Sequence, residues 1–584
     1  MSVPRPQAES SFKQRRERLE KSLVVWKPAT LSQHFDTIAA SYPDRPLVIS
    51  DHYTYTYKEM ATWSRRIASG LIASGVRSGA NVALILGNFP EFVAVKLAIA
   101  RLGATSVPIN FLLRRAELRY ILEQSDSVAL ITMSAFRDID YLQELDAIAP
   151  GWEGRGGGVQ LPKLRSVFVL PTSEVARSGV RTLEDLERAG TTRSDNALAQ
   201  REAAGIPQSR CDIIYTSGTT GRSKGVILTH EMVLRTAYAS AYTRAFEDGR
   251  RILFALPMYH VFGYVECLIA STFVAGAIVP HAVFDPEQML NAWERHRATE
   301  IVCVPTMTVK LIDIARKRGQ ASPRLVSFFN SGGANPPEIW GEIRRYFAPQ
   351  EIFTAYGMTE TTASTTCTQP DDPEARLLET NGCLKPAGLA GDPELGGVLA
   401  LYKAVDPESG QDLPPGTRGE LLVRGPTVTP GYYNKPEETA AAFSNGWLHT
   451  GDVGTVAQDG YLTLLGRIKE TYRCGGEMVM PLEIEELVNQ HPLVAQALVV
   501  GVPDAKMGEV GCLCIVPRGN ARPEPDELIN LCAQRLARFK VPCHVMFIAP
   551  EEIPITVTGR PQKFKLAELV RQRLRASGET PRNQ

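Results

Sequence analysis

The sequence predicts an α/β protein: a large multi-lobed N-terminal domain, with two α/β lobes and a β-rich lobe, followed by a small mobile α+β C-terminal domain. Helical patterns alternate with short apolar strand patterns through roughly the first 300 residues, which favours helices layered on largely parallel sheets. From about residue 385 the pattern changes to short apolar runs separated by Gly and Pro, which is typical of β-structure. The length of 584 residues accommodates several such units.

The first elements follow from apolar spacing and helix caps. A helix is expected over residues 56–72, because its apolar residues recur at helical spacing and Thr56 with Glu59 forms a capping-box pattern. The apolar run NVALILG at 81–87 has the length of a buried strand. A later helix is expected to start at Asp285, with Pro286 in its first turn.

The domain boundaries are predicted from changes in composition. Residues 1–30 form a polar arm without the apolar run of a secretory signal or membrane anchor, and we expect this arm to be mobile. Residues 31–466 are expected to form the large domain. A compact helix and strand pattern then resumes over 470–584, which predicts a C-terminal domain hinged near Lys469.

Charge and cysteine content exclude several classes of function. Lys plus Arg and Asp plus Glu both number 64, so no overall field attracts nucleic acid or anionic lipid. The longest apolar run, about 14 residues from Cys267, is too short for a transmembrane segment. The ten cysteines include no CxxC pair, which indicates a reduced, cytoplasmic protein without a cysteine metal site.

A glycine-rich loop, YTSGTTGRSKGV at 215–226, follows the strand pattern DIIY. Its glycines allow backbone N–H groups to surround an anion, and a polyphosphate is the natural partner. A Walker A loop is the obvious rival, because Gly218 and Lys224 have the right separation. However, Ser223 replaces the second glycine and Gly225 replaces the residue that would bind Mg²⁺, so that pattern fails at two positions. The remaining alternative is a flexible polar surface loop.

Together with six further blocks in the same order, this loop resembles the adenylate-forming superfamily, which contains acyl-CoA synthetases, luciferases and peptide-synthetase adenylation domains. The blocks are PMYHVFGY (257–264), NSGGANPP (330–337), YGMTETT (356–362), HTGDVG (449–454), GRIKETYRCGGEMVMPLEIEE (466–486) and GVPDAKMGE (501–509). The resemblance covers roughly residues 30–575. It implies that a small carboxylic acid is activated by ATP with Mg²⁺ to an acyl-adenylate (acyl-AMP), which coenzyme A (CoA) then converts to a thioester.

The resemblance also implies a nucleotide site. Tyr356 would stack on adenine, and Asp452 would accept hydrogen bonds from the ribose hydroxyls with Arg467 nearby. Glu360 and Thr216 would hold Mg²⁺. Taken alone, Glu360 would be a cap or a solvated side chain, and Asp452 a turn residue. The other residues implied in cofactor binding are Ser217, Gly218, Thr219, Thr220, Gly221, Lys224, Gly333, Ala334, Gly357, Met358, Thr359 and Gly475.

A second group of residues is implied in the chemistry and in domain motion. His260 would lie beside the entrance for the acyl group and CoA, although alone it would be a core histidine. The C-terminal domain would rotate about Lys469 between the two half-reactions. Gly475 and Gly476 would let the pantetheine arm of CoA pass close to the backbone, unless they form an ordinary glycine turn.

The chain departs from the family pattern at one position. The final family motif, P-x-T-x-[ST]-G-K, is matched by PITVTGRP at 554–561, with Arg560 where the catalytic lysine stands. A planar guanidinium does not place charge as a compact ammonium does, and a misplacement of about 1 Å can cost about 10²-fold in rate. We therefore expect weak or absent adenylation, and formation of acyl-CoA from an acyl-AMP supplied by a separate adenylating enzyme, with release of AMP.

Three alternatives stay open. The first is a complete ATP-dependent, AMP-forming acyl-CoA ligase in which Arg560 suffices. The second is a pseudoenzyme that binds an adenylate without turnover, and the third is a loading domain for a separate carrier protein. The identity of the acyl substrate is not encoded in any one segment, because glycines such as Gly332 and Gly357 both leave room for a bulky acid and serve the fold.

Overall fold

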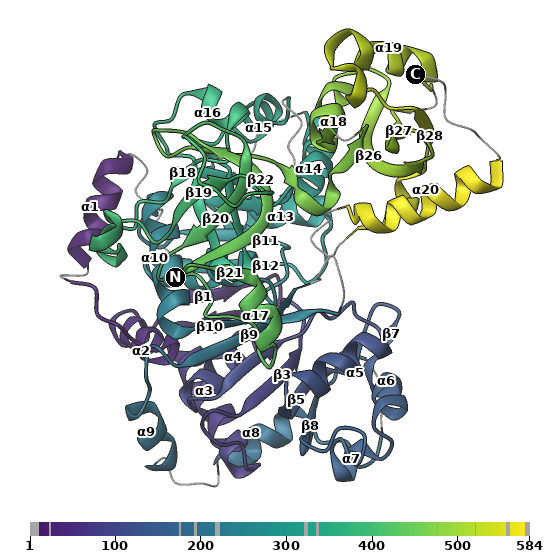
Figure 1. Cartoon of the computed structure of the whole chain (residues 1–584). Coiled ribbons are helices and arrows are strands. Elements are labelled where there is room, and N and C mark those ends of the chain that lie inside the picture. The colour runs from purple at the N-terminus through teal and green to yellow at the C-terminus, as the bar shows by residue number, and fades with distance from the viewer. Residues whose placement is uncertain are drawn as a thin grey trace.

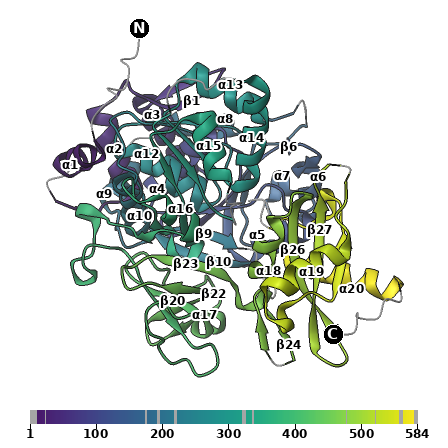
Figure 2. The ribbon, with the colours of Figure 1, turned by 90° about the horizontal axis from the view of Figure 1, so that it is seen from above.

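The large domain contains two α/β lobes, as the sequence predicts, and a smaller domain lies beside it (Figures 1 and 2). The computed structural model describes residues 11–22, 25–173, 177–191, 196–216, 222–319, 325–333, 338–475, 477–519, 521–555 and 561–577. Within these residues, no helix is long and apolar enough to cross a membrane.

The first lobe is built on a six-stranded sheet in the order β10-β9-β4-β3-β5-β8. Its pairs are parallel except for the hairpin of β9 and β10. The strands are β3 (Asn81–Ile85), β4 (Thr105–Pro108), β5 (Ser127–Met133), β8 (Ser166–Leu170), β9 (Arg210–Thr216) and β10 (Lys224–Thr229). The surrounding elements are α2 (Leu31–Ser41), α3 (Tyr57–Ala73), α4 (Pro90–Arg101), α5 (Arg115–Gln124), β6 (Ala135–Phe136), β7 (Ile139–Asp140), α6 (Tyr141–Ile148), α7 (Trp152–Arg155), α8 (Leu183–Thr191) and α9 (Asn196–Ala203).

The second lobe is built on a seven-stranded sheet in the order β15-β14-β13-β11-β12-β1-β2, parallel apart from β1 with β2. Its strands are β1 (Pro46–Ile49), β2 (Thr54–Thr56), β11 (Arg251–Phe254), β12 (Ala277–Pro280), β13 (Glu300–Cys303), β14 (Ser327–Asn330) and β15 (Glu351–Phe353). Its helices are α10 (His230–Thr243), α11 (Val261–Gly263), the π-helix η1 (Tyr264–Ile269), α12 (Ala270–Thr272), α13 (Pro286–His296), α14 (Pro305–Arg318) and α15 (Ile339–Phe347).

Antiparallel structure begins earlier than the expected residue 385, because β16 and β17 already form a hairpin. This part contains β16 (Ala355–Met358), η2 (Thr359–Thr361), β17 (Ala363–Cys367), α16 (Glu374–Glu379), β18 (Cys383–Leu384), η3 (Gly388–Ala390) and η4 (Pro393–Leu395). The β-rich lobe follows with β19 (Leu401–Val405), β20 (Gly419–Arg424), α17 (Pro436–Ala442), β21 (Phe443–Ser444), β22 (Trp447–Val456) and β23 (Leu462–Arg467).

The C-terminal domain has its own apolar core, which includes Ile484, Val499 and Leu513. The single turn η5 (Ile468–Glu470) leads into it from β23 and contains Lys469, whose role as a hinge stays a prediction. Its elements are β24 (Tyr472–Cys474), β25 (Glu477–Val479), α18 (Pro481–Asn489), β26 (Val494–Asp504), β27 (Gly508–Pro517), α19 (Pro525–Arg535), η6 (Arg538–Lys540), β28 (His544–Phe547), η7 (Pro550–Glu552) and α20 (Lys563–Ser577).

The expected helix caps are present. Thr56 Oγ1 accepts from the backbone N–H of Glu59 at 3.2 Å, and Glu59 Oε2 accepts from the backbone N–H of Thr56 at 2.8 Å. Asp285 Oδ1 accepts from the N–H of Gln288 at 2.8 Å. Both helix starts are therefore confirmed, because local side-chain chemistry determines them.

The expectation of a mobile N-terminal arm is wrong for residues 12–22. These residues form helix α1 (Phe12–Ser22), which packs beside α10. Arg15 is 5 % exposed, donates from Nε to Ala245 O at 2.6 Å and pairs with Glu351. Arg16 donates to Tyr242 O at 2.9 Å. Buried Arg15 and Leu19 therefore hold this helix in place, and neither belongs to an apolar run in the sequence.

Candidate active site

The glycine-rich loop connects β9 and β10. Thr216 and Lys224 are register partners at the end of this hairpin, so the loop starts and ends at one point of the sheet. Ser223 O accepts from the hydroxyl of Tyr120 at 3.0 Å, which holds the described end of the loop. Residues 217–221, which the sequence assigns to phosphate binding, lie outside the described residues, as do Ala334, Gly476 and Arg560.

Lys224 and Glu360 both contact Tyr432, a residue that the sequence analysis did not identify. Lys224 Nζ lies 4.8 Å from the ring centroid of Tyr432, and the hydroxyl of Tyr432 donates to Glu360 Oε1 at 3.1 Å. The N–H of Thr429 donates to Glu360 O at 2.7 Å. Burial raises the pKa of Glu360, while Tyr432 and Arg467 act in the opposite direction. A carboxylate beside a lysine suits a site for Mg²⁺ and phosphate, and the assignment of Mg²⁺ to Glu360 and Thr216 stays a prediction.

Tyr356, Asp452 and Arg467 lie together, and of these contacts the sequence predicts only that Arg467 is near Asp452. The hydroxyl of Tyr356 donates to Asp452 Oδ2 at 2.6 Å. Asp452 and Arg467 are register partners on β22 and β23, and Arg467 Nε lies 2.9 Å from Asp452 Oδ1. These two atoms are buried and close enough for charge attraction, yet neither has a hydrogen-bond partner within the described part of the chain. Buried polar atoms normally have partners, so the pair fits a ligand that supplies hydroxyl groups, such as a ribose.

The glycines of the site differ in what they do. A Cβ at Gly357 would lie 2.0 Å from Ala363 O, at the bulge between β16 and β17, so the fold itself requires glycine there. A Cβ at Gly333 would meet only Pro305, at 3.5 Å, which is an ordinary contact. Met358 and Thr359 lead into η2, where the N–H of Met358 donates to Thr361 Oγ1 at 3.1 Å. Of the two assigned glycines, only Gly333 leaves space that a larger side chain would fill.

His260 caps the short helix α11. Its Nδ1 accepts from the N–H of Phe262 at 3.2 Å, which leaves the proton of the neutral ring on Nε2. Burial lowers the pKa of His260 to about 4. A Cβ at Gly332 would lie 3.8 Å from the ring of Phe262, so the His260 segment packs against the segment that follows β14. This histidine is therefore a neutral hydrogen-bonding group near physiological pH.

Lys469, the expected hinge residue, lies near Lys224 and Arg467. Burial lowers the pKa of Lys469, and the neighbouring charges of Lys224 and Arg467 lower it further. Three cations thus gather where polyphosphate is expected. Gly475 has φ +61°, and its N–H donates to Met507 O at 2.8 Å. This hydrogen bond fixes the backbone at Gly475 to the rest of the C-terminal domain.

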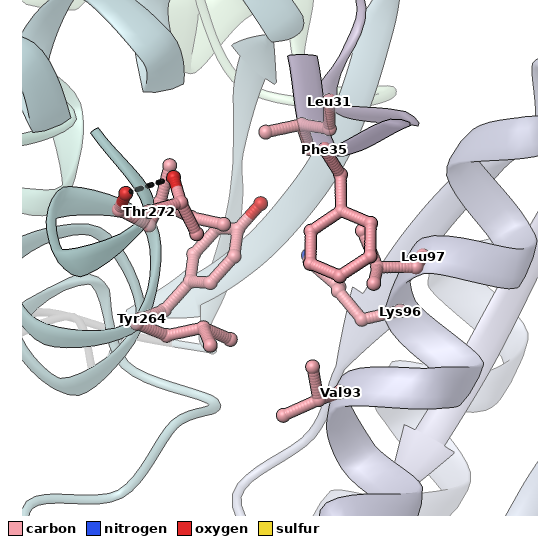
Figure 3. A pocket seen from close by; sticks show the side chains of 9 residues that line it. Leu31, Phe35, Val93, Lys96, Leu97, Tyr264 and Thr272 are labelled. Atoms are coloured by element: carbon pink, nitrogen blue, oxygen red, sulfur yellow. Dashed lines mark hydrogen bonds between the residues drawn. The ribbon is translucent and has the colours of Figure 1, made fainter. Parts of the chain in front are cut away.

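An enclosed space between α2, α4 and η1 lies elsewhere in the large domain (Figure 3). Phe35, Val93 and Tyr264 contribute to its lining, together with Lys96, whose Nζ pairs with Asp212. Its volume of about 10 Å³ accommodates about one water molecule, so it is no substrate pocket.

Comparison with known proteins agrees with this fold. The model of the AMP-binding enzyme family matches residues 35–433, and that of the AMP-binding enzyme C-terminal domain matches residues 483–560. The chain therefore belongs to the AMP-binding enzyme family.

Individual relatives extend over nearly the whole chain. The feruloyl-CoA synthase of Amycolatopsis sp is 30 % identical, with 89 % of this chain and 96 % of that protein covered. The mitochondrial medium-chain acyl-CoA ligase ACSF2 of Danio rerio is 28 % identical, covering 94 % and 89 %. Among solved structures, ATP-bound MatB from Rhodopseudomonas palustris has a TM-score of 0.77 and 26 % identity, covering 92 % of this chain and 99 % of that chain.

Proposed function

We propose that this protein is a complete ATP-dependent, AMP-forming acyl-CoA ligase. In the first half-reaction a carboxylate oxygen attacks the α-phosphorus of ATP, and the bond to pyrophosphate breaks. In the second, the thiolate of CoA attacks the acyl carbon of acyl-AMP, and AMP leaves. The observation that carries the proposal is the ion pair of Asp452 and Arg467, in which Asp452 Oδ1 and Arg467 Nε are buried and make no hydrogen bond within the described residues. These two atoms suit the hydroxyl groups of a ribose, near Lys224 and Glu360.

The described residues divide the work of the first half-reaction. Tyr356 offers its ring to adenine and orients Asp452 toward the ribose. Lys224, Lys469 and Arg467 neutralise the charge that develops when a carboxylate approaches a phosphate. Glu360 and Thr216 would hold Mg²⁺, which supplies further charge neutralisation on the phosphate oxygens when bound.

The second half-reaction needs a path for the pantetheine thiol. His260 is neutral at working pH, so it does not repel or attract the incoming thiolate by charge, and its Nε2–H is available as a donor. Rotation about Lys469 would bring the turn at Gly475 toward the acyl-AMP. Both roles follow from the family resemblance and stay proposals.

The relatives change the balance between the functions considered from sequence. Their names describe CoA ligases and synthases, which supports the complete reaction better than a thioesterification-only enzyme. Arg560 itself favours the second candidate, in which a separate adenylating enzyme supplies acyl-AMP. Lys563 does not replace the missing catalytic lysine, because its Nζ is held by two carboxylates. It lies 2.7 Å from Glu485 and 3.7 Å from Glu470, which belongs to η5.

The two candidates are separated by acid-dependent exchange of pyrophosphate into ATP. Wild type, Arg560→Lys and Arg560→Ala would be compared over a panel of aliphatic, aromatic and dicarboxylic acids, with Lys565→Ala, an exposed basic residue nearby, as the matched control. The complete ligase predicts exchange in wild type that falls at least about 100-fold in Arg560→Ala.

A different result would identify one of the alternatives. Exchange only in Arg560→Lys, together with CoA-dependent AMP release from synthetic acyl-AMP in wild type, would replace the proposal by the thioesterification-only enzyme. Tight acyl-AMP binding without any AMP release would identify a pseudoenzyme, and acyl transfer to a carrier protein in place of CoA would identify a loading domain.

A further inference from the structure

A buried carboxylate lies between the two halves of the candidate site. Glu266 belongs to the π-helix η1, which begins four residues after His260, and its side chain is 1 % exposed. π-helical turns inside helices are rare and occur frequently at functional sites. The motif assignments from sequence do not include Glu266, and the proposed chemistry does not use it.

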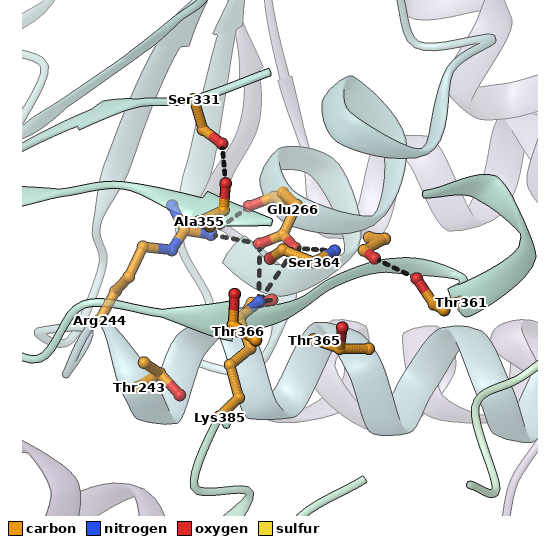
Figure 4. Close-up of polar contacts among 12 residues, drawn as sticks. Thr243, Arg244, Glu266, Ser331, Ala355, Thr361, Ser364, Thr365, Thr366 and Lys385 are labelled. Atoms are coloured by element: carbon orange, nitrogen blue, oxygen red, sulfur yellow. Dashed lines mark hydrogen bonds and ion pairs between the residues drawn. The ribbon is translucent and has the colours of Figure 1, made fainter. Parts of the chain in front are cut away.

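Four groups from three other parts of the chain converge on this carboxylate (Figure 4). The backbone N–H of Ser364 donates to Glu266 Oε1 at 3.0 Å, and the Ser364 hydroxyl donates to the same oxygen. Lys385 Nζ lies 3.0 Å from Oε1, and an Arg244 guanidinium nitrogen lies 3.4 Å from Oε2. Lys385 is 3 % exposed and Arg244 is 0 % exposed, so water does not compete for these contacts.

The contact with Ser364 reaches the nucleotide-binding strands directly. Ser364 is the register partner of Gly357, where the pairing of β16 and β17 shifts at a bulge. At a bulge the local ladder is disrupted, and the Ser364 N–H leaves the ladder to bond Glu266. The same hairpin carries Tyr356 on β16 and Glu360 in its turn. The Glu266 carboxylate therefore anchors the same hairpin whose Tyr356 and Glu360 contact Asp452 and Tyr432.

The charge balance makes this anchor strong. Burial would raise the pKa of Glu266, but Lys385 and Arg244, with hydrogen bonds from serines, hold it at about 2. Glu266 is thus ionised at every physiological pH. Arg244 continues the network to Glu300 at 2.5 Å, and Glu300 is also fully buried. Hydrogen bonds in which one partner is ionised are roughly twice as strong as neutral ones.

We propose that Glu266 is a positioning residue for the nucleotide: it fixes the β16–β17 hairpin to the helix that follows His260, so that the adenylate side and the acyl side of the site hold one relative placement. This inference rests on the proposed function for the identity of the nucleotide. In physical terms, removal of the carboxylate lets the β16–β17 hairpin move relative to η1, while the rest of the domain stays folded.

The test uses a charge-balanced variant, because an unpaired Lys385 would itself unfold the protein. In Glu266→Met with Lys385→Met, both the carboxylate and its lysine are replaced by apolar side chains of similar length. Glu300→Gln is the matched control, since Glu300 is equally buried and also pairs with Arg244, but no contact joins it to the hairpin in the described residues. ATP affinity is measured by calorimetry on the full chain, with Tm alongside.

We expect the double variant to bind ATP at least about tenfold more weakly, with the KM for CoA within twofold of wild type. We expect Glu300→Gln to bind ATP within twofold of wild type, although its Tm falls because Arg244 and Arg250 lose a charged partner. Equal loss of ATP affinity in both variants, or none in either, would overturn the proposal. If the double variant does not fold, Ser364→Ala decides: a threefold or greater weakening supports the anchor, and unchanged affinity refutes it. Because ATP binding is read directly, a failure here is distinct from absent turnover with every acid, which would count against the proposed function.

Discussion

The hydroxyl of Tyr356 lies 2.6 Å from Oδ2 of Asp452, although 96 residues separate the two in sequence. The hydrogen bond joins the strand expected beside adenine to the strand expected beside ribose. It also leaves the other carboxylate oxygen facing Arg467. One interaction thus orders the two residues on which recognition of the nucleoside depends.

Replacement of Tyr356 by Phe keeps the ring and removes this orienting bond. Because hydrogen bonds to charged groups contribute about 1.5–3 kcal/mol, we expect ATP to bind roughly tenfold or more weakly in Tyr356→Phe. Tyr402→Phe is the control: its hydroxyl contacts Thr365 Oγ1 at 2.6 Å and its ring packs 5.9 Å from that of Tyr356. Equal ATP affinity in wild type and Tyr356→Phe, measured by calorimetry, would show that the hydroxyl plays no part.

Gly357 and Gly333 are expected to differ in how much their replacement by alanine lowers the free energy of unfolding. In Gly357→Ala the new Cβ would lie 2.0 Å from Ala363 O, so the hairpin must distort, at a cost of roughly 1–3 kcal/mol or more in the free energy of unfolding. In Gly333→Ala the nearest atom is at 3.5 Å, and we expect stability close to wild type with a changed preference among acids. Urea unfolding of the two variants gives the comparison, and similar destabilisation by both would contradict it.

Three buried histidines predict loss of stability in mild acid. Burial lowers the pKa of His34 and His260 to about 4 and that of His230 to about 3. Below about pH 6.5 the unfolded chain takes up protons that the folded chain does not, so the free energy of unfolding falls as the pH falls toward 4. Each histidine contributes at most about 1.4 kcal/mol per pH unit.

Unfolding by urea between pH 7.5 and 5.0 measures this slope. His230 Nδ1 accepts from the N–H of Leu31 at 3.2 Å, and a glutamine oxygen can accept the same bond. We therefore expect His230→Gln to flatten the decline without a large change at pH 7.5. A slope that is the same in the variant and in wild type would mean that this histidine does not carry the effect.

The docking of α1 predicts that replacement of Arg15 greatly lowers the free energy of unfolding. Arg15→Ala leaves Glu351, whose side chain is 9 % exposed, without its ion-pair partner, and breaking such a buried pair costs roughly 3–5 kcal/mol. Lys21→Ala on the same helix removes a side chain that is 79 % exposed, and we expect a change within about 0.5 kcal/mol. Thermal unfolding of both variants tests this, and a mild effect of Arg15→Ala would show that α1 is dispensable.

The proposed hinge at Lys469 predicts that the two half-reactions respond differently to proline. Lys469→Pro restricts the backbone at η5, whereas Lys469→Ala removes the side chain alone. We expect the proline variant to lose one half-reaction by at least about 100-fold and to keep the other within a few-fold, with both retained in Lys469→Ala apart from weaker phosphate binding. Pyrophosphate exchange and AMP release from acyl-AMP report the two steps separately. Equal losses in the two variants would place the hinge elsewhere.

The sequence predicts well those features that depend on local patterns. The alternation of helices and strands, the caps at Thr56 and Asp285, and the class of the fold are confirmed, because each is encoded within about 20 residues. The closeness of Asp452 and Arg467 was expected from motifs of one family, whereas the contact of Tyr356 with Asp452 was not predicted.

Features that depend on distant polar contacts could not be predicted. Glu266 and Ser364 are 98 residues apart, and Glu360 and Tyr432 are 72 apart, with no periodic signal that joins them. The pKa of His260 depends on burial by segments far along the chain. The docking of α1 was missed for the same reason, since its arginines indicate solvent exposure when read alone.

Arg15 and Glu351 are 336 residues apart, so the order of synthesis separates them in time. At about 5–20 residues per second, Arg15 leaves the ribosome roughly 20–70 s before its partner. An isolated helix of 11 residues is marginal in water, so α1 has no stable place during that interval. Helix α1 therefore reaches its final place long after it is translated, because its docking needs strand β15, which carries Glu351.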